Sequence, residues 1–159
     1  MKKSMGLKVA VLSAAILCMI GVSAIYAGTT VPDEIKMENK AYDAHKKSIV
    51  TFSHKKHATD YKAGCGDCHH DEKGKPLANL KEGDDVKGCI ECHSKPGEKP
   101  KGKGAPKLTK QEELGFHAEA IHDNCKGCHK KYNKEKGLKS KDKGAAPVTC
   151  TQCHPKSAK

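Results

Sequence analysis

Arginine and tryptophan are absent from this chain of 159 residues, and aromatic side chains make up 4% of it. The mean hydropathy is −0.72, and apolar side chains are thinly scattered outside the first segment. A conventional hydrophobic core would therefore be small. All 30 basic residues are lysine, but the lack of arginine, of aromatic platforms and of a recognisable motif argues against a nucleic-acid-binding protein.

The first 27 residues are the apolar exception. Three lysines precede an apolar run over residues 9–22, and small residues end at Ala27, which is the pattern of a cleaved signal peptide. The run is too short to span a bilayer comfortably, so we expect export to the periplasm without stable membrane insertion. Cleavage is expected after Ala27 or, alternatively, after Ala24. Residues 28–159 then form a single domain, and Cys18 is lost with the signal peptide.

Four copies of Cys-x-x-Cys-His punctuate the remaining 132 residues. We number them motif one (Cys65, Cys68, His69), motif two (Cys89, Cys92, His93), motif three (Cys125, Cys128, His129) and motif four (Cys150, Cys153, His154). Each is typical of c-type haem attachment, in which two thiols form thioether bonds to the porphyrin and the histidine is the proximal iron ligand. A lone Cys-x-x-Cys also serves thioredoxin-like and zinc sites, but four copies with a trailing histidine favour four haems. No cysteine pair is left for a disulfide.

The four haems change how the composition is interpreted. Their faces bury apolar area that the side chains do not supply, so we expect them to form the core and the chain without haem to be largely unfolded. After signal cleavage, 27 lysines stand against 19 acidic residues, a net charge of +8. The negative charges of the haem propionates offset much of this net positive charge. Lysines can steer an acidic redox partner towards the protein. Eight of them gather between motifs three and four, at Lys126, Lys130, Lys131, Lys134, Lys136, Lys139, Lys141 and Lys143.

Local patterns predict a few short elements. Residues 48–52 alternate and are rich in β-branched side chains, which predicts a strand. Ser53 is expected to cap a short helix that carries His54 and His57. A capping box of Thr109 and Glu112 opens a helix expected over about residues 110–123. Residues 94–107 and 134–146 have the composition of Lys/Gly loops.

Six histidines outside the motifs are candidates for the second axial ligands: His45, His54, His57, His70, His117 and His122. Only one methionine, Met37, follows the signal peptide, so bis-histidine ligation at all four irons is the economical expectation, and it implies low reduction potentials. His54 and His57 point to nearly the same side of a helix and should serve two different haems. His70 must diverge from its neighbour His69 and reach another haem. The helix pattern leaves His45, His117 and His122 open for the fourth position.

The run Phe52-x-His54-x-x-His57, then Cys65-x-x-Cys68-His69-His70, then three more haem motifs, resembles the class III cytochromes c. This is the cytochrome c3 type of sulfate- and metal-reducing bacteria, and the likeness covers essentially the whole mature chain. It implies four ligand pairs: His54 with His69, His57 with His129, His70 with His93, and His122 with His154. His117 and His45 are then unligated, and Phe52 resembles an aromatic residue that packs between two haems. All four motifs have two-residue gaps, as in the type II subgroup, although that subgroup is usually acidic.

These patterns predict a small, mostly irregular and α-helical multihaem cytochrome c fold with a short two-stranded β element and a core of four clustered haems. The expected function is periplasmic electron transfer in anaerobic respiration. We expect a monomer that takes electrons from a hydrogenase or dehydrogenase and passes them to a membrane-bound cytochrome complex. The alternative is a multihaem reductase of a metal ion or small oxyanion. An enzyme of that kind needs an open iron position, and eight histidines for four irons leave none.

Overall fold

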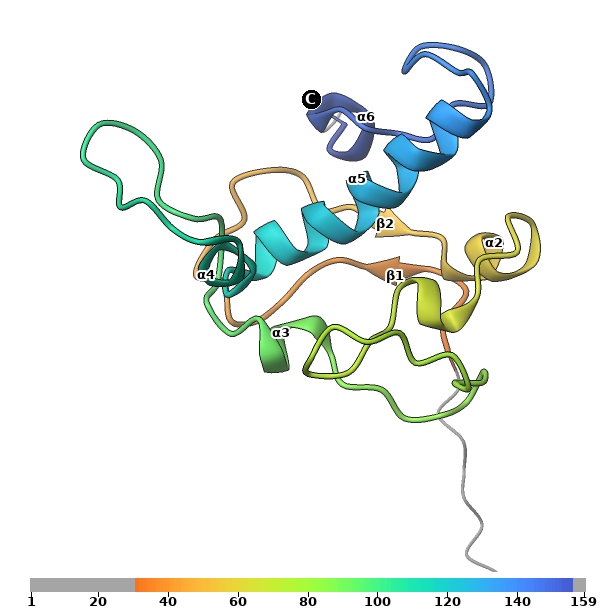
Figure 1. Ribbon diagram of the computed structural model, residues 1–159, viewed down its shortest axis with the longest axis horizontal. Helices are drawn as coiled ribbons and strands as arrows, with labels where there is room; N and C mark the ends of the chain where they lie inside the picture. Colours follow the sequence, from red (N-terminus) through yellow and green to blue (C-terminus); the bar gives the residue numbers. More distant parts are fainter. Residues whose placement is uncertain (1–30, 156–159) are drawn as a thin grey trace, which may run out of the picture.

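One long helix runs through the molecule, and all other elements are short (Figure 1). The computed structural model describes residues 31–155. The long helix is α5 (His117–Glu135), with 19 residues. The other described elements are β1 (Ile35–Lys36), β2 (Thr51–Phe52), α2 (His54–Thr59), the single 3-10 turn η1 (Cys65–Asp67), α3 (Cys89–Cys92), α4 (Lys110–Leu114) and α6 (Cys150–Cys153).

The two strands form a small antiparallel sheet, as predicted. Ile35 pairs with Phe52, and Lys36 pairs with Thr51. The strand expected over residues 48–52 is shorter than predicted, because only Thr51–Phe52 belongs to the sheet. Strand β2 leads directly into the helix that carries His54 and His57.

Helix α2 begins at His54, as the sequence predicted, with Ser53 at the N-cap position. The Ser53 side chain makes no capping hydrogen bond, so that part of the prediction was wrong. The Ser53 carbonyl instead accepts from the His57 backbone N–H at 3.3 Å and bonds the His57 ring Nδ1 at 2.8 Å. The backbone of Ser53 thereby orients one of the expected iron ligands.

The helix expected over residues 110–123 is two helices. The capping box of Thr109 and Glu112 opens α4 as predicted, with the Glu112 carboxylate accepting from the Thr109 N–H at 2.7 Å. The chain then turns extended at Phe116, because Lys95 donates to the Gly115 carbonyl at 3.0 Å and accepts from the His117 N–H at 2.8 Å. This long-range backbone pairing interrupts the helix, which restarts as α5 and continues through motif three.

The side-chain core is as small as the composition predicts. Ala120 is the one buried apolar residue of the described chain, and no described side chain falls below 2% exposure. The buried polar residues there are His117 and Asn133. Across residues 31–155, no helix is long and apolar enough to cross a membrane.

Candidate haem-binding site

Each haem motif is folded as one helical turn. In motifs one, two and four the proximal histidine donates its backbone N–H to the carbonyl of the first cysteine, at 2.9, 2.9 and 2.7 Å respectively. Motif three adopts the same turn inside α5. Residues three and four positions apart share one side of a helix. The two cysteines and the histidine of each motif therefore face the same way, as attachment to one porphyrin requires.

The residue just before the second cysteine caps the three isolated turns. Asp67 accepts from the Gly64 N–H at 2.8 Å, Glu91 from the Gly88 N–H at 2.5 Å, and Gln152 from the Thr149 N–H at 3.1 Å. Each bond satisfies a backbone donor that a helix start leaves unpaired. In motif three this position is Gly127, which lies within α5 and needs no cap. This glycine is visible in the sequence, but the helix prediction for this region did not take it into account.

The loop after motif one folds back onto that motif. The Leu77 N–H donates to the His69 carbonyl at 2.9 Å, and Asp71 donates to the Lys75 carbonyl at 2.9 Å. Gly66 is needed here, because a Cβ at this position would lie 3.1 Å from the Leu77 carbonyl carbon. The close approach fixes the backbone on both sides of His70, which must leave motif one to serve another haem.

Three of the four expected ligand pairs have their rings beside each other. The ring centroids of His57 and His129 are 6.2 Å apart, those of His70 and His93 are 5.9 Å apart, and those of His122 and His154 are 6.4 Å apart. Two metal–imidazole bonds of about 2 Å on opposite sides of one ion put the ring centres roughly 6 Å apart. The residues present thus fit an iron between each pair.

The fourth expected pair is His54 with His69. Burial is the main cause that lowers the pKa of His69, and the nearby charges of His54 and His70 lower it further. The Phe52 ring lies 6.0 Å from the His54 ring and 4.6 Å from the His57 ring. Phe52 therefore contacts both histidines of the α2 pair, at the place that the resemblance gives to an aromatic residue between two haems.

Backbone carbonyls hold the Nδ1 atom of five of these histidines. The carbonyl partners belong to Leu114 for His93 (2.5 Å), Pro147 for His129 (2.7 Å), Ser48 for His154 (2.7 Å), Ser53 for His57 (2.8 Å) and Asp71 for His70 (2.8 Å). A carbonyl oxygen only accepts hydrogen bonds, so Nδ1 must carry the proton and the neutral ring keeps a free lone pair on Nε2. Such bonds are the usual support of metal-ligating histidines.

His117, one of the three histidines left open in the sequence, has a different environment. Its Nδ1 bonds to the Tyr42 hydroxyl at 2.9 Å, and its side chain is buried. The Tyr42 ring also stacks on the exposed His45 ring, with centroids 4.9 Å apart. His117 and His45 thus share one aromatic partner, and burial lowers the pKa of His117.

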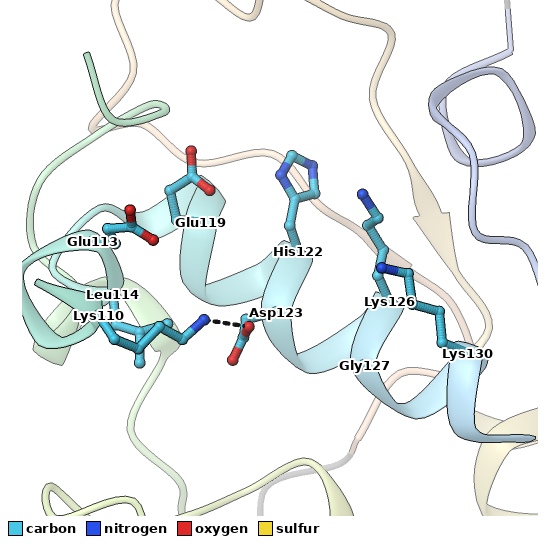
Figure 2. A pocket seen from close by; sticks show the side chains of 9 residues that line it. All are labelled: Lys110, Glu113, Leu114, Glu119, His122, Asp123, Lys126, Gly127 and Lys130. Carbon is cyan, nitrogen blue, oxygen red and sulfur yellow. Dashed lines mark hydrogen bonds and ion pairs between the residues drawn. The ribbon is translucent and has the colours of Figure 1, made fainter. Parts of the chain in front are cut away.

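His122 stands on the side of α5 that lines an open pocket, together with Lys126 and Lys130 (Figure 2). Burial lowers the pKa of His122, which favours the neutral ring that a metal ligand requires. Asp123, which lines the same pocket, forms an ion pair with Lys110 of α4 at 2.5 Å (Figure 2). That contact holds α4 against the helix that presents His122.

The eight described cysteines form no disulfide. The surrounding chain desolvates the Cys125 thiol, and this raises its pKa to about 11. Cys68 lies near it and contributes to the same effect. Asn124 also donates to the Cys68 carbonyl at 3.1 Å. Motifs one and three therefore lie side by side, although about 60 residues separate them in the sequence.

Comparison with known proteins gives a consistent family. The model of the class III cytochrome c family matches residues 30–156. A cytochrome c3 of Desulfovibrio desulfuricans is 32% identical over 111 residues, which cover 70% of this chain and 82% of the relative. A cytochrome c3 of Nitratidesulfovibrio vulgaris strain Hildenborough is 28% identical over 126 residues, which cover 73% of this chain and 76% of the relative. No solved structure matches the chain significantly.

Proposed function

Because the chain belongs to the class III cytochrome c family, which binds haem c and transports electrons, we propose that it is a periplasmic low-potential electron carrier. In this proposal it holds four covalent haems, each with two histidine ligands. The signal peptide pattern of residues 1–27 supports export, although those residues lie outside the described part of the chain.

The observation that carries the proposal is the convergence of histidines from distant parts of the chain. His57 and His129 are 72 positions apart in the sequence, yet their rings stack at 6.2 Å with an angle of 23° between their planes. Both rings are half-buried, and holding two ionisable rings side by side away from water is unfavourable without a shared partner. An iron between them provides that partner, and it agrees with the protonation of Nδ1 that the carbonyls impose.

Three groups of residues hold the haems in this proposal. The cysteines Cys65, Cys68, Cys89, Cys92, Cys125, Cys128, Cys150 and Cys153 anchor the porphyrins, and His69, His93, His129 and His154 approach from the side of their own motif. His54, His57, His70 and His122 complete the coordination. When bound, each haem supplies a one-electron couple between ferric and ferrous iron. Histidine in place of methionine at the second position keeps the potentials low.

Occupied coordination positions favour a carrier over a reductase. A catalytic metal needs an open position for its substrate, and the four proposed pairs use two histidines for every iron. His117, whose ring is buried and whose Nδ1 bonds to Tyr42, belongs to none of these pairs. We therefore assign electron transfer between proteins as the function, in the anaerobic respiration of sulfate or metal ions.

The ligand assignment is tested at His122, one of the three histidines that the helix pattern left open. His122→Met should raise one of the four reduction potentials and leave the other three nearly in place, because methionine ligation raises haem potentials. A spectroelectrochemical titration with haem quantification measures this. His45→Met is the matched control, since His45 is exposed, and it should move none. A shift with His45→Met, or no shift with His122→Met, would contradict the pairing.

The lysine-rich surface between motifs three and four is the proposed docking site for an acidic donor such as hydrogenase. Seven of its eight lysines are exposed, and Lys126 is half-buried beside His122 (Figure 2). Reversing Lys130, Lys134 and Lys139 to glutamate should slow reduction by hydrogenase, most strongly at low ionic strength. The check is the stopped-flow rate at two salt concentrations. Rates that respond to neither change would assign docking to another surface.

A further inference from the structure

Asn133 forms a clamp between the end of α5 and the chain that leads to motif four. Its Nδ2 donates to the Ala146 carbonyl at 2.9 Å, and its Oδ1 accepts from the Ala146 N–H at 2.7 Å. Both polar groups of the amide are thus used on the two backbone groups of one residue. The Asn133 side chain is only 6% exposed, and a buried amide requires such pairing. The clamp closes the loop of residues 136–145 at its base (Figure 1).

The clamped residue directly precedes the carbonyl that holds His129. Pro147 follows Ala146, and the His129 Nδ1 bonds to the Pro147 carbonyl at 2.7 Å. Proline has a fixed φ, so one of the torsions between the clamped Ala146 and the Pro147 carbonyl is already set. Asn133 also stands four residues after His129, on the same side of α5. One helix face therefore carries both the iron ligand and the residue that positions its hydrogen-bond acceptor.

We propose that Asn133 is a positioning residue that sets the reduction potential of the haem bound through His129. This inference rests on the proposed function, because it requires an iron at His129. The Nδ1–H bond to a carbonyl makes the opposite ring nitrogen, Nε2, a stronger electron donor. A stronger donor favours ferric over ferrous iron and so lowers the potential. Asn133 maintains this effect by keeping the Pro147 carbonyl in place.

Removing the clamp should raise one potential. Asn133→Leu keeps the approximate volume of the side chain but removes both bonds to Ala146. We expect the equilibrium of the His129 haem to move about tenfold towards the ferrous form, the same order as the effect of losing a supporting bond on metal affinity. The other three haems should stay nearly unchanged. Potentials are followed haem by haem, by NMR during a redox titration.

Asn39→Leu is the matched control. The Asn39 side chain accepts from the Ala41 N–H at 2.9 Å, away from every haem motif in the sequence. This variant loses a side-chain bond to the backbone but should shift no potential. Asn133→Ser, which leaves room for a water at Ala146, should shift the same haem in the same direction by less. If Asn133→Leu lowers stability and moves no potential, Asn133 only closes the loop and the proposal is overturned.

A second measurement needs no variant. In the intact holoprotein, the His129 Nδ1 proton should exchange with solvent at least tenfold more slowly than the Nδ1 proton of the exposed His70. Equal rates would overturn the proposal even if the variants fail to assemble. Fewer than four reversible haems would instead contradict the proposed function. Four reversible haems without these effects contradict only the role of Asn133.

Discussion

Motif three lies inside the 19-residue helix α5, whereas motifs one, two and four each occupy an isolated turn. The isolated turns have three or four residues, far below the length at which a helix is stable in water. Each carries its own capping side chain, Asp67, Glu91 or Gln152, while motif three has Gly127 at that position. The same motif is thus maintained in two ways, by helix propagation or by a local cap.

The comparison shows where the haems are most needed. Helix α5 has its own backbone hydrogen bonds and contacts with α4 and α3. The isolated turns have a cap and a few long-range bonds, and the described chain offers almost no apolar core to hold them. Covalent attachment at both cysteines of a turn supplies what the side chains lack. Loss of haem should therefore affect the two regions unequally.

The largest expected effect follows from preventing haem attachment. A chain produced without haem ligation should lose motifs one, two and four entirely and keep only partial helix around α5, because four-residue helices cannot persist alone. Far-UV circular dichroism and amide hydrogen exchange measure this. Residues 117–135 should retain the slowest exchange of the haem-free chain. A cooperative thermal transition in that chain, with protection in all four motifs, would contradict the account.

A smaller effect is expected from removing one cap. Glu91→Ala deletes the bond to the Gly88 N–H and should lower the free energy of unfolding by about 1 kcal/mol, the usual contribution of a helix cap. Unfolding by guanidinium, followed through the haem absorbance, gives the change in midpoint. Glu38→Ala removes the same charge from an exposed position outside the motifs and should have almost no effect.

Motif three provides the counterpart of that experiment. A Cβ on Gly127 would meet no atom within 4 Å, and glycine within a helix costs about 0.5–1 kcal/mol relative to alanine. Gly127→Ala should therefore stabilise the protein slightly, where Glu91→Ala destabilises it. Equal losses in both variants would mean that the two kinds of motif are not maintained differently.

Local patterns in the sequence predicted the elements whose causes are local. The capping box of Thr109 and Glu112 and the start of α2 at His54 are examples. The spacing of His57, His70 and His122 in the family pattern also named three pairs that the structure brings together. The local elements depend on residue type and spacing, which the sequence states directly, whereas the pairs were implied by the family resemblance.

Features with distant causes were missed. The break at Phe116 depends on the Lys95 backbone, 21 positions earlier. The Tyr42 bond to His117 joins residues 75 positions apart. Asn133 could be recognised as a clamp only when Ala146 was placed beside it. The continuation of α5 through motif three was also missed, although Gly127 in place of a capping residue is a local signal for it.

The central claim is that each of the four irons lies between two histidines. The proposed pairs are His57 with His129, His70 with His93, His122 with His154, and His54 with His69. Low-temperature electron paramagnetic resonance of the fully ferric protein, integrated against the measured haem content, tests it most directly. We predict that all the signal is low-spin, with four haems per chain and none open to added cyanide or carbon monoxide after reduction. A high-spin signal amounting to one haem per chain would contradict the claim and favour a reductase with an open iron.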